Sequence, residues 1–558
     1  MTKSMTGGRF IAEALRAHGV THVFFMDAIL RRALVEMEKI GIRRILAHSE
    51  KGAAYMADGY ARVARRPAVC MSQSVGAANL AAGLQDAFLG DAPVIALTGR
   101  QPAPMQYRHA YQEVPHEPLF ASVTKASMRV DQPEQLPLLL NQAFRHATTG
   151  RPGPVHVDIA GHTGDAIAAA LLPAEPAIGG APYDRFPAFR LAPPNELLQR
   201  AGELIAAARR PVFVADMGVM TSQAEGALAR LAEHLSVPVV GSLDAKSVLL
   251  EEHPLNAGIV GTYSRSCANR TVAEADLVIF VGSRAGDQVT NNWTLPPSSA
   301  RVIQINAEAE DLGRNYPAAL GVPGDPRTVL EALLTLCPAQ RREEWVGRVR
   351  TLVAAWREEV AKDRDAAAVP IRPERLCREV GEFLPEDAIL VSDTGYSSQW
   401  SGTLVSLRSA GQRYLRAAGS LGWAFPAAIG AKCAAPDRPV VCFAGDGAFM
   451  YHLTELETAR RYGIPVIVVV NNNSCLAQGA RAIGEAYKGQ PGNPGEIHNF
   501  RPTNFAAIAN AMDCRGIRVE HASEYGSAMK QALRSDIPTV IDVVTDPDVL
   551  APLPWGPG

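Results

Sequence analysis

The most constraining feature of the sequence is a strand–turn–helix–strand pattern that ends in three asparagines. The apolar run 440–443 leads into the Gly-Asp-Gly turn 445–447, a helical pattern follows, and 466–470 is an unbroken β-branched run. Runs of this kind form buried parallel strands. Because the carboxyl ends of parallel strands lie on one side of a sheet, we expect Asp446 to meet the asparagines 471–473 there.

The residue types in this pattern suit a metal-bound diphosphate. A carboxylate, an amide oxygen and a backbone carbonyl leave room for water or phosphate oxygens around a hard cation, which is the coordination that Mg²⁺ prefers. Glycines in the turn let backbone N–H groups approach a phosphate at a helix N-terminus. Gly-Asp-Gly alone is an ordinary turn, so the prediction depends on the long spacer and the terminal asparagines.

The whole pattern resembles the signature of thiamine-diphosphate enzymes, which is G-D-G, a long spacer and then N-N. The resemblance makes Asp446 and Asn473 side-chain ligands of the metal and Cys475 a backbone carbonyl ligand. Counting from Asp446 through Glu455 and Pro465 places Asn473, rather than its neighbours, in the ligand position. The residues that the resemblance assigns to the cofactor in this turn are Gly445, Gly447 and Ala448.

A second segment resembles the pyrimidine-domain motif of the same family. Residues 48–62 read H-S-E-K-G-A-A-Y-M-A-D-G-Y-A-R. The resemblance implies that Glu50 hydrogen-bonds the aminopyrimidine of the cofactor and promotes the proton transfer that activates it, a role for a group whose pKa is tuned by its surroundings. A lone glutamate before a helix is otherwise a first-turn charge that complements the helix dipole. Two halves of one composite site in one chain favour the catalytic role.

Further positions take their expected roles from the same resemblance. Tyr396 and Ser397 follow an apolar strand and are expected at the diphosphate. Gly419 would offer its carbonyl to the 4′-amine, and Leu421 would wedge between the two cofactor rings; the alternative for Leu421 is a core leucine.

The loop at 109–116 is expected beside the thiazolium ring. By resemblance Gln112 lines that side of the pocket, and the alternative is an ordinary surface residue. His109 and His116 flank this loop. We expect both to be solvated rather than catalytic.

Across nearly the whole chain the sequence is most similar to acetohydroxyacid synthases, but it departs from them around the substrate. A family glycine loop reads F-M-D-A-I at 25–29, which places Asp27 where glycines leave space. Gln288 stands where the synthases carry an arginine that grips the acceptor keto acid. Loss of a guanidinium that binds carboxylate bidentately is not conservative. We therefore expect Asp27 and Gln288 to define the substrate, and the standard branched-chain synthase reaction is not expected.

Composition limits the partners. The chain has 558 residues, a formal net charge of −2 and no lysine or arginine block, so neither a nucleic acid nor an anionic membrane is expected. Its eight cysteines show no C-x-x-C pair, and no apolar run approaches the length of a membrane span. These features predict a cytoplasmic protein.

Alternating helix and strand patterns predict an α/β fold of three doubly wound domains with parallel sheets. We expect a pyrimidine-binding domain at 1–170, a central Rossmann-like domain at 190–335 and a diphosphate- and metal-binding domain at 366–545. The central domain of acetohydroxyacid synthases holds FAD. No G-x-G-x-x-G fingerprint occurs in this chain, so the expectation that FAD could bind rests only on the resemblance to these synthases.

The sequence thus predicts an enzyme that uses thiamine diphosphate and Mg²⁺ to cleave or form a C–C bond in a 2-oxo acid or related small carbonyl compound. The alternatives are a decarboxylase of the benzoylformate or oxalyl-CoA type, a sulfoacetaldehyde acetyltransferase, a cyclic-diketone lyase and a non-catalytic cofactor-binding subunit. By resemblance, the active sites lie between the subunits of a homodimer or homotetramer.

Overall fold

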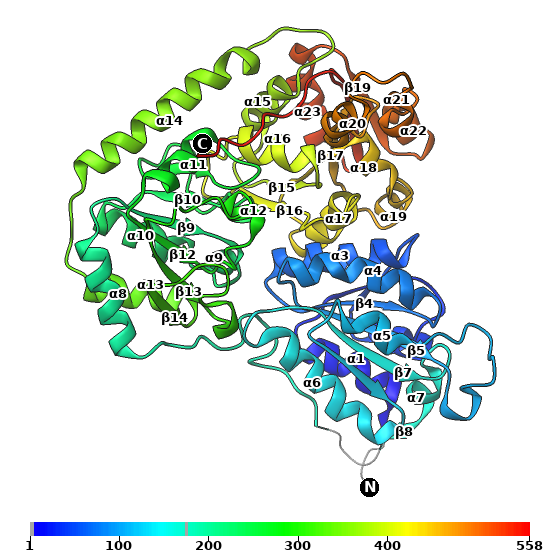
Figure 1. Cartoon of the computed structure of the whole chain (residues 1–558). Coiled ribbons are helices and arrows are strands. Elements are labelled where there is room, and N and C mark those ends of the chain that lie inside the picture. The colour runs from blue at the N-terminus through cyan, green and yellow to red at the C-terminus, as the bar shows by residue number, and fades with distance from the viewer. Residues whose placement is uncertain (1–4, 173–176, 558) are drawn as a thin grey trace.

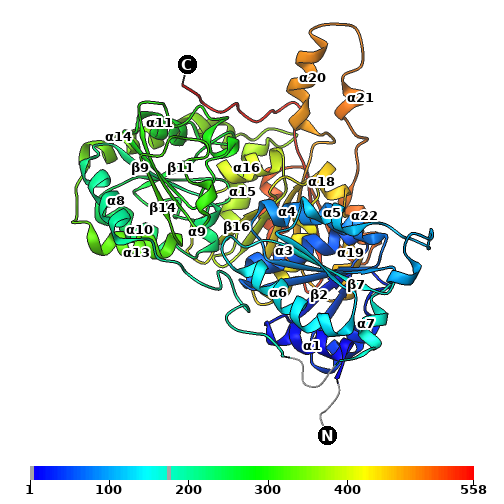
Figure 2. The same ribbon diagram turned by 60° about the horizontal axis from the view of Figure 1, so that its bottom comes forward.

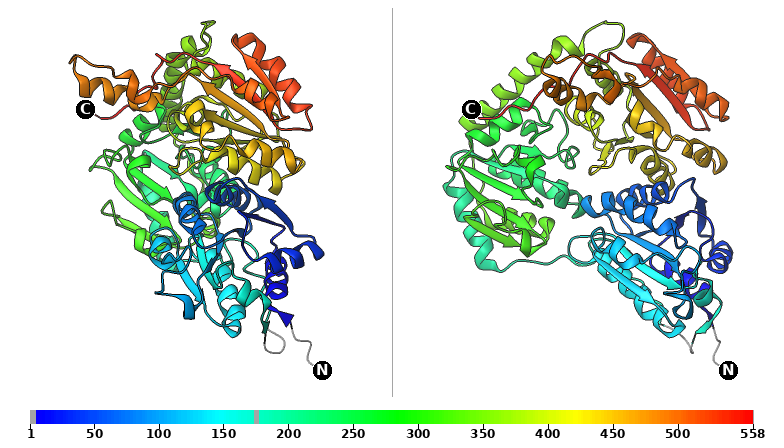
Figure 3. Two further views of the ribbon diagram at one scale, coloured as in Figure 1. Left: turned by 90° about the vertical axis from the view of Figure 1, so that its right-hand side faces the viewer. Right: turned by 45° about the vertical axis from the view of Figure 1, so that its right-hand side comes forward.

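Three six-stranded parallel sheets, each covered by helices, make up the computed structural model of the chain, which describes residues 5–172 and 177–557. The units follow one another around a ring in Figure 1, with the first at the bottom, the second at the left and the third at the upper right. Figure 3 shows the same three-part arrangement from two other sides. The α/β class with three parallel sheets is therefore confirmed.

The first unit has the strand order β3-β2-β4-β5-β7-β6, and a short antiparallel pair, β1-β8, joins its two ends. Its elements are β1 (Met5–Thr6), α1 (Gly7–Ala17), β2 (His22–Phe25), α2 (Arg31–Lys39), β3 (Arg43–Leu46), α3 (Glu50–Ala64), β4 (Ala68–Ser72), α4 (Gly76–Leu89), β5 (Val94–Arg100), α5 (His116–Ala121), β6 (Ala126–Val130), α6 (Leu136–Thr148), β7 (Val155–Ala160), α7 (Asp165–Ala169) and β8 (Leu171–Leu172).

The central unit has the order β11-β10-β9-β12-β13-β14, so the direction of winding changes between β9 and β12. Its elements are α8 (Asn195–Ala207), β9 (Pro211–Ala215), α9 (Met217–Thr221), α10 (Glu225–Leu235), β10 (Val239–Gly241), β11 (Asn256–Ile259), α11 (Ser266–Glu274), β12 (Leu277–Val281), α12 (Asp287–Thr290), β13 (Arg301–Asn306), β14 (Leu320–Pro323), α13 (Pro326–Leu336) and the connecting helix α14 (Glu343–Arg364).

The third unit has the order β16-β15-β17-β18-β20-β19, and its winding changes between β15 and β17. Its elements are α15 (Pro373–Phe383), β15 (Ile389–Ser392), α16 (Tyr396–Leu404), β16 (Arg413–Arg416), α17 (Ala424–Ala434), β17 (Val440–Gly445), α18 (Asp446–Met450), α19 (Glu455–Arg461), β18 (Ile467–Asn472), α20 (Ala480–Tyr487), α21 (Gly495–His498), α22 (Phe505–Ala511), β19 (Arg515–Val519), α23 (Tyr525–Leu533) and β20 (Thr539–Val544).

The helix after the Gly-Asp-Gly turn is broken, and this corrects the single helix that the apolar spacing predicts. α18 ends at Met450 and α19 begins at Glu455. Phe449 on α18 and Leu456 on α19 lie on the two sides of this break. Both side chains are fully buried and belong to the same hydrophobic core. The spacing of apolar residues in the sequence indicates which side chains are buried. It cannot distinguish one continuous helix from two short helices joined by a turn, because both arrangements keep the same spacing.

Helices α3 and α17 hold the first and third units together. A Cβ atom at Gly59 would overlap the backbone carbonyl of Ala427, and one at Gly430 would overlap that of Met56. The two helices therefore touch backbone to backbone, which only glycine allows. No described helix is both long and apolar enough to cross a membrane.

A buried polar cluster also crosses this contact. Asp58 on α3 accepts from Arg62, with an Nε–Oδ1 distance of 2.7 Å, and from the indole of Trp423 at 2.8 Å. Asp86 on α4 accepts backbone N–H groups of the segment 418–420. The loop that carries Gly419 is thereby fixed against the first unit.

Candidate active site

The diphosphate half of the predicted site lies at the carboxyl ends of β15 and β17, where the third sheet changes its winding direction. This is where open α/β sheets bind their ligands. The cavity there is lined by Thr394, Gly395, Tyr396, Ser397, Trp400, Leu421, Gly445, Asp446, Gly447, Ala448, Asn471, Asn473, Cys475, Leu476, Ala477, Gln478, Gly479, Ile483, Ile497 and His498. Residues predicted from two distant segments therefore meet around one cavity.

Asp446 is the buried acid of this cavity. Its carboxylate accepts the N–H groups of Gly447 at 2.6 Å and of Cys475 at 3.2 Å. Burial raises the pKa of the Asp446 carboxyl to about 6, and these backbone donors oppose that shift. Among the described residues no lysine or arginine forms an ion pair with it. A buried carboxylate without a basic partner is suited to a bound cation.

The three asparagines at the end of β18 alternate in direction. Asn472 donates to the carbonyl of Thr503 and to Asp542, each at 2.8 Å, and so is held away from the cavity. Asn471 and Asn473 line the cavity, as the period of two along a strand requires. The side-chain oxygen of Asn471 is buried without a hydrogen-bond partner. Asp446, Asn473 and the carbonyl of Cys475 form a set of oxygens that could hold Mg²⁺.

The N-terminus of α16 borders the same cavity. Gly395 precedes it with φ of 69°, in the left-handed region that favours glycine. Tyr396 is the first helical residue, and the hydroxyl of Ser397 accepts the N–H of Gly445 at 2.9 Å. Backbone N–H groups at such a helix start are available to a phosphate. Leu421 lines the cavity and is half-buried, whereas Gly419 is not among the lining residues and has room for an added Cβ atom.

Glu50 is the first residue of α3, whose start is capped by Ser49, which accepts the N–H of Gly52 at 2.9 Å. Its carboxylate accepts from Asn79 at 3.2 Å. A Cβ atom at Gly76 would overlap the Glu50 carboxylate. The glutamate therefore lies against the turn that starts α4, half-buried.

Gln112 reaches the same turn. Its backbone carbonyl accepts the hydroxyl of Ser74 at 2.6 Å, and its side-chain oxygen is buried without a partner. Its φ of 58° is unusual for a side-chain-bearing residue, and such strain collects at functional sites. Glu50 and Gln112 thus both contact the segment 73–79.

The two flanking histidines differ from each other. His109 is exposed, as the sequence predicts, but His116 is 3% exposed, so the expectation that it is solvated is wrong. It opens α5 and faces the sheet instead of the solvent. A loop histidine at the first residue of a short helix gives no periodic signal that would reveal its burial.

The two halves do not meet within one chain. All the residues that line the cavity around Asp446 come from the third unit, and Glu50 and Gln112 are not among them. Figure 2 shows α20 and α21 projecting away from the body of the chain, and both helices contribute residues to the lining of this cavity. α20 has no buried residue. The described chain therefore presents two separate half-sites.

Asp27 and Gln288 lie in different places. Asp27 follows β2 on an exposed loop and pairs with Arg31 at 3.4 Å. Gln288 lines a crevice of the central unit, where its side-chain oxygen accepts from Arg416 at 2.7 Å. Arg416 is also bound in a bidentate pair by Asp244, at 2.7 and 3.0 Å. The Arg416 guanidinium that contacts Gln288 is therefore already neutralised by the carboxylate of Asp244.

The central crevice lies at the carboxyl ends of β9 and β12, where a nucleotide would be expected. The hydrogen-bond donors at the ends of these strands are already used by Asp216. Its carboxylate accepts from the hydroxyls of Ser242 and Ser283 at 2.6 and 2.7 Å and from the N–H of Met217 at 2.9 Å. Burial, and then the nearby Asp244, raise the pKa of Asp216. The crevice thus lies where a nucleotide cofactor would be expected, but the donors of its phosphate-binding turn are already bound to Asp216 and do not suit a pyrophosphate.

Comparison with protein families decides the class. Three family models match in order: the N-terminal TPP binding domain of thiamine pyrophosphate enzymes at residues 5–119, their central domain at 198–333 and their C-terminal TPP binding domain at 393–543. The chain belongs to the thiamine pyrophosphate enzymes. Curated relatives that match the chain over most of its length carry acetolactate synthase names.

A probable acetolactate synthase large subunit of Methanocaldococcus jannaschii is 32% identical over 573 residues, covering 98% of this chain and 93% of the relative. The acetolactate synthase of Arthrospira platensis is 31% identical, covering 97% and 94%. The isozyme 1 large subunit of Escherichia coli is 33% identical, covering 85% and 83%. This thiamine pyrophosphate enzyme is therefore acetolactate-synthase-like over most of its length.

Proposed function

We propose that this enzyme cleaves and forms C–C bonds in a 2-oxo acid or related carbonyl compound, as a decarboxylase or carboligase. The observation that carries the proposal is the pair of half-sites, with Glu50 and Gln112 at one and Asp446 with Asn473 at the other. When bound, thiamine diphosphate would supply a nucleophilic carbon and a sink for the electron pair of the bond that is cleaved. The protein supplies binding, orientation and proton transfer.

Mg²⁺ is the proposed metal. Asp446, Asn473 and the Cys475 carbonyl would hold it, and the unpartnered oxygen of Asn471 supports a further polar contact at this cavity. The diphosphate would lie at the start of α16, against Tyr396 and Ser397. Contacts of the Gly445–Ala448 turn with the diphosphate, of the Gly419 carbonyl with the 4′-amine and of Leu421 with both rings belong to the same proposal.

The active unit is proposed to be a homodimer, alone or paired into a tetramer. Each half-site is incomplete in its own chain, and a second copy would supply the missing half. The buried free thiols of the chain suit a reducing compartment such as the cytoplasm. The limits 1–170, 190–335 and 366–545 remain our proposed domain boundaries.

The acceptor is proposed to differ from that of a branched-chain synthase. Position 288 offers an amide, and the Arg416 guanidinium that binds this amide is already paired with Asp244, so neither of these two residues offers a free guanidinium to a second carboxylate. Asp27 is exposed, paired only with the exposed Arg31 among the described residues, and could face a substrate bound with a partner copy. We include no flavin in the reaction, because Asp216 fills the phosphate-binding turn.

Product analysis tests this proposal. The purified protein with thiamine diphosphate, Mg²⁺ and pyruvate is assayed alone and with a second 2-oxo acid or an aldehyde. A condensed product indicates carboligation, and free aldehyde indicates decarboxylation. If pyruvate is not consumed although the cofactor binds, the aryl, CoA-linked, sulfonated and cyclic carbonyl substrates of the alternatives are screened next. Lack of turnover with all of them would leave only the non-catalytic subunit.

A further inference from the structure

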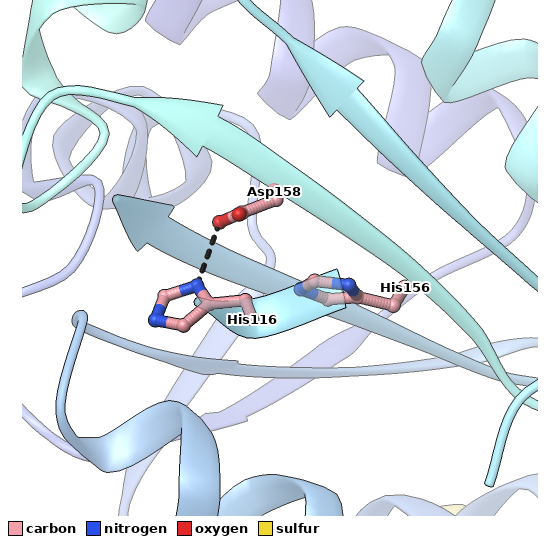
Figure 4. A group of neighbouring side chains, drawn as sticks. All are labelled: His116, His156 and Asp158. Carbon is pink, nitrogen blue, oxygen red and sulfur yellow. Dashed lines mark hydrogen bonds and ion pairs between the residues drawn. The ribbon is translucent and has the colours of Figure 1, made fainter. Parts of the chain in front are cut away.

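Directly behind Gln112 lies a buried cluster of two histidines and an aspartate. Figure 4 shows His116, His156 and Asp158 with their polar atoms facing one another. All three side chains are at most 4% exposed. Sequence similarity and the cofactor sites described above give this cluster no role.

His156 is held between two hydroxyl groups. The Thr98 hydroxyl donates to Asp158 at 2.8 Å, so Thr98 accepts from Nε2 of His156, 2.7 Å away. The other nitrogen, Nδ1, lies 2.8 Å from the Ser127 hydroxyl, which can donate to it. Burial lowers the pKa of His156 to about 3, in agreement with a neutral ring.

The same reasoning gives His116 a proton on both nitrogens. Its Nε2 lies 2.9 Å from the backbone carbonyl of Ser74, which can only accept. Its Nδ1 lies 3.0 Å from the Asp158 oxygen that already accepts from Thr98. Two acceptors require two N–H donors, and therefore an imidazolium. The charged groups that face it are Asp158 and, beyond that carboxylate, Arg100, whose Nε is 3.7 Å from Asp158.

His116 is connected to Gln112 through a single residue. The carbonyl of Ser74 accepts from His116, and the hydroxyl of Ser74 donates to the carbonyl of Gln112 at 2.6 Å. The chain of contacts therefore runs from Asp158 on β7 through His116 and Ser74 to Gln112. Ser74 also begins the turn whose Gly76 lies against Glu50.

We propose that His116, doubly protonated and anchored by Asp158, is a positioning residue that fixes Ser74 and through it Gln112 at the pyrimidine half of the active site. This inference deepens the proposed function and rests on it. The alternative of a metal bound by the three side chains is disfavoured, because each ring nitrogen of the cluster already has a hydrogen-bond partner.

Two isosteric variants separate the two bonds of the ring. In His116→Gln the amide nitrogen can replace Nε2 and keep the bond to Ser74, whereas in His116→Asn it can replace Nδ1 and keep only the bond to Asp158. We expect His116→Gln to retain kcat within about threefold and His116→Asn to lose about tenfold or more, with KM changed less than kcat, because misplacing a catalytic group lowers the rate of the chemical step.

Ser74→Ala provides an independent variant that keeps the histidine cluster intact. It removes the donor to Gln112 and should lower kcat as His116→Asn does, and the double variant should be no worse than either single one. Equal kcat losses in His116→Gln and His116→Asn, or additive losses in the double variant, would overturn the proposal.

A measurement without turnover separates this inference from the proposed function. In histidine-labelled protein, ¹⁵N NMR at neutral pH should show one ring, absent in His116→Gln, with both nitrogens protonated. A ring with one bare nitrogen at that position, or one equivalent of zinc in the dialysed protein, would contradict the assignment whatever the substrate proves to be. If no substrate is found but this signal is present, the proposed function fails and the protonation state stands.

Discussion

Glu50→Gln is expected to lower kcat by roughly 100- to 10,000-fold, the range typical for loss of a positioned proton-transfer group. The amide keeps the shape of the side chain and can still accept from Asn79, which lies 3.2 Å from the carboxylate. Thiamine diphosphate affinity should therefore change little. Exchange of the thiazolium C2 proton, followed by NMR, should slow in parallel with turnover.

Asn79→Ala is the matched control for this prediction. It removes the one side-chain donor to Glu50 but leaves the carboxyl group in place. We expect it to lower kcat by much less than Glu50→Gln does. Wild-type proton exchange in Glu50→Gln would show that the glutamate is only a first-turn helix charge, which would remove the basis for its catalytic role.

Asp446→Ala is expected to abolish turnover through loss of the metal. Removing a residue that only hydrogen-bonds a metal ligand already lowers metal affinity by about 10- to 100-fold. Asp446 is itself a proposed ligand and the one charged side chain among them, so its loss should cost more. Titration calorimetry should show Mg²⁺-dependent cofactor binding weakened by at least about 100-fold. High Mg²⁺ should restore little activity.

Asp437→Ala is the control on the same unit, because Asp437 is exposed and precedes β17, whereas Asp446 follows the carboxyl end of that strand. It should bind the cofactor as the wild type does. The fold should survive in Asp446→Ala, since the change removes a buried carboxylate rather than an apolar contact. If Asp446→Ala bound Mg²⁺ and cofactor normally, the proposed metal site would be wrong.

Sequence patterns predicted the sheets well because buried parallel strands need continuous apolar runs. The runs 440–443 and 466–470 became β17 and β18, and their carboxyl ends brought Asp446 to the asparagines. Counting along the chain favours Asn473 as the ligand, but it gives no sign of what Asn472 contacts. The strand period turned Asn472 towards Asp542, and that partner is 70 residues away in sequence.

Other parts of the site depended on partners that no local pattern reveals. The burial of His116 follows from Asp158 and Ser74, which come from other segments of the chain. The sequence showed that Gln288 replaces an arginine, but not that Arg416 lies next to it in a pair with Asp244. Such pairings are fixed by packing between units and not by periodicity.

The separation of the two half-sites has a consequence for genetics. In the proposed dimer each active site takes Glu50 from one chain and Asp446 from the other. Co-expressing Glu50→Gln and Asp446→Ala chains, each inactive alone, should therefore yield mixed dimers in which one site carries both defects and the other carries none. Two null alleles would then complement each other, with activity up to half that of a wild-type dimer per hybrid.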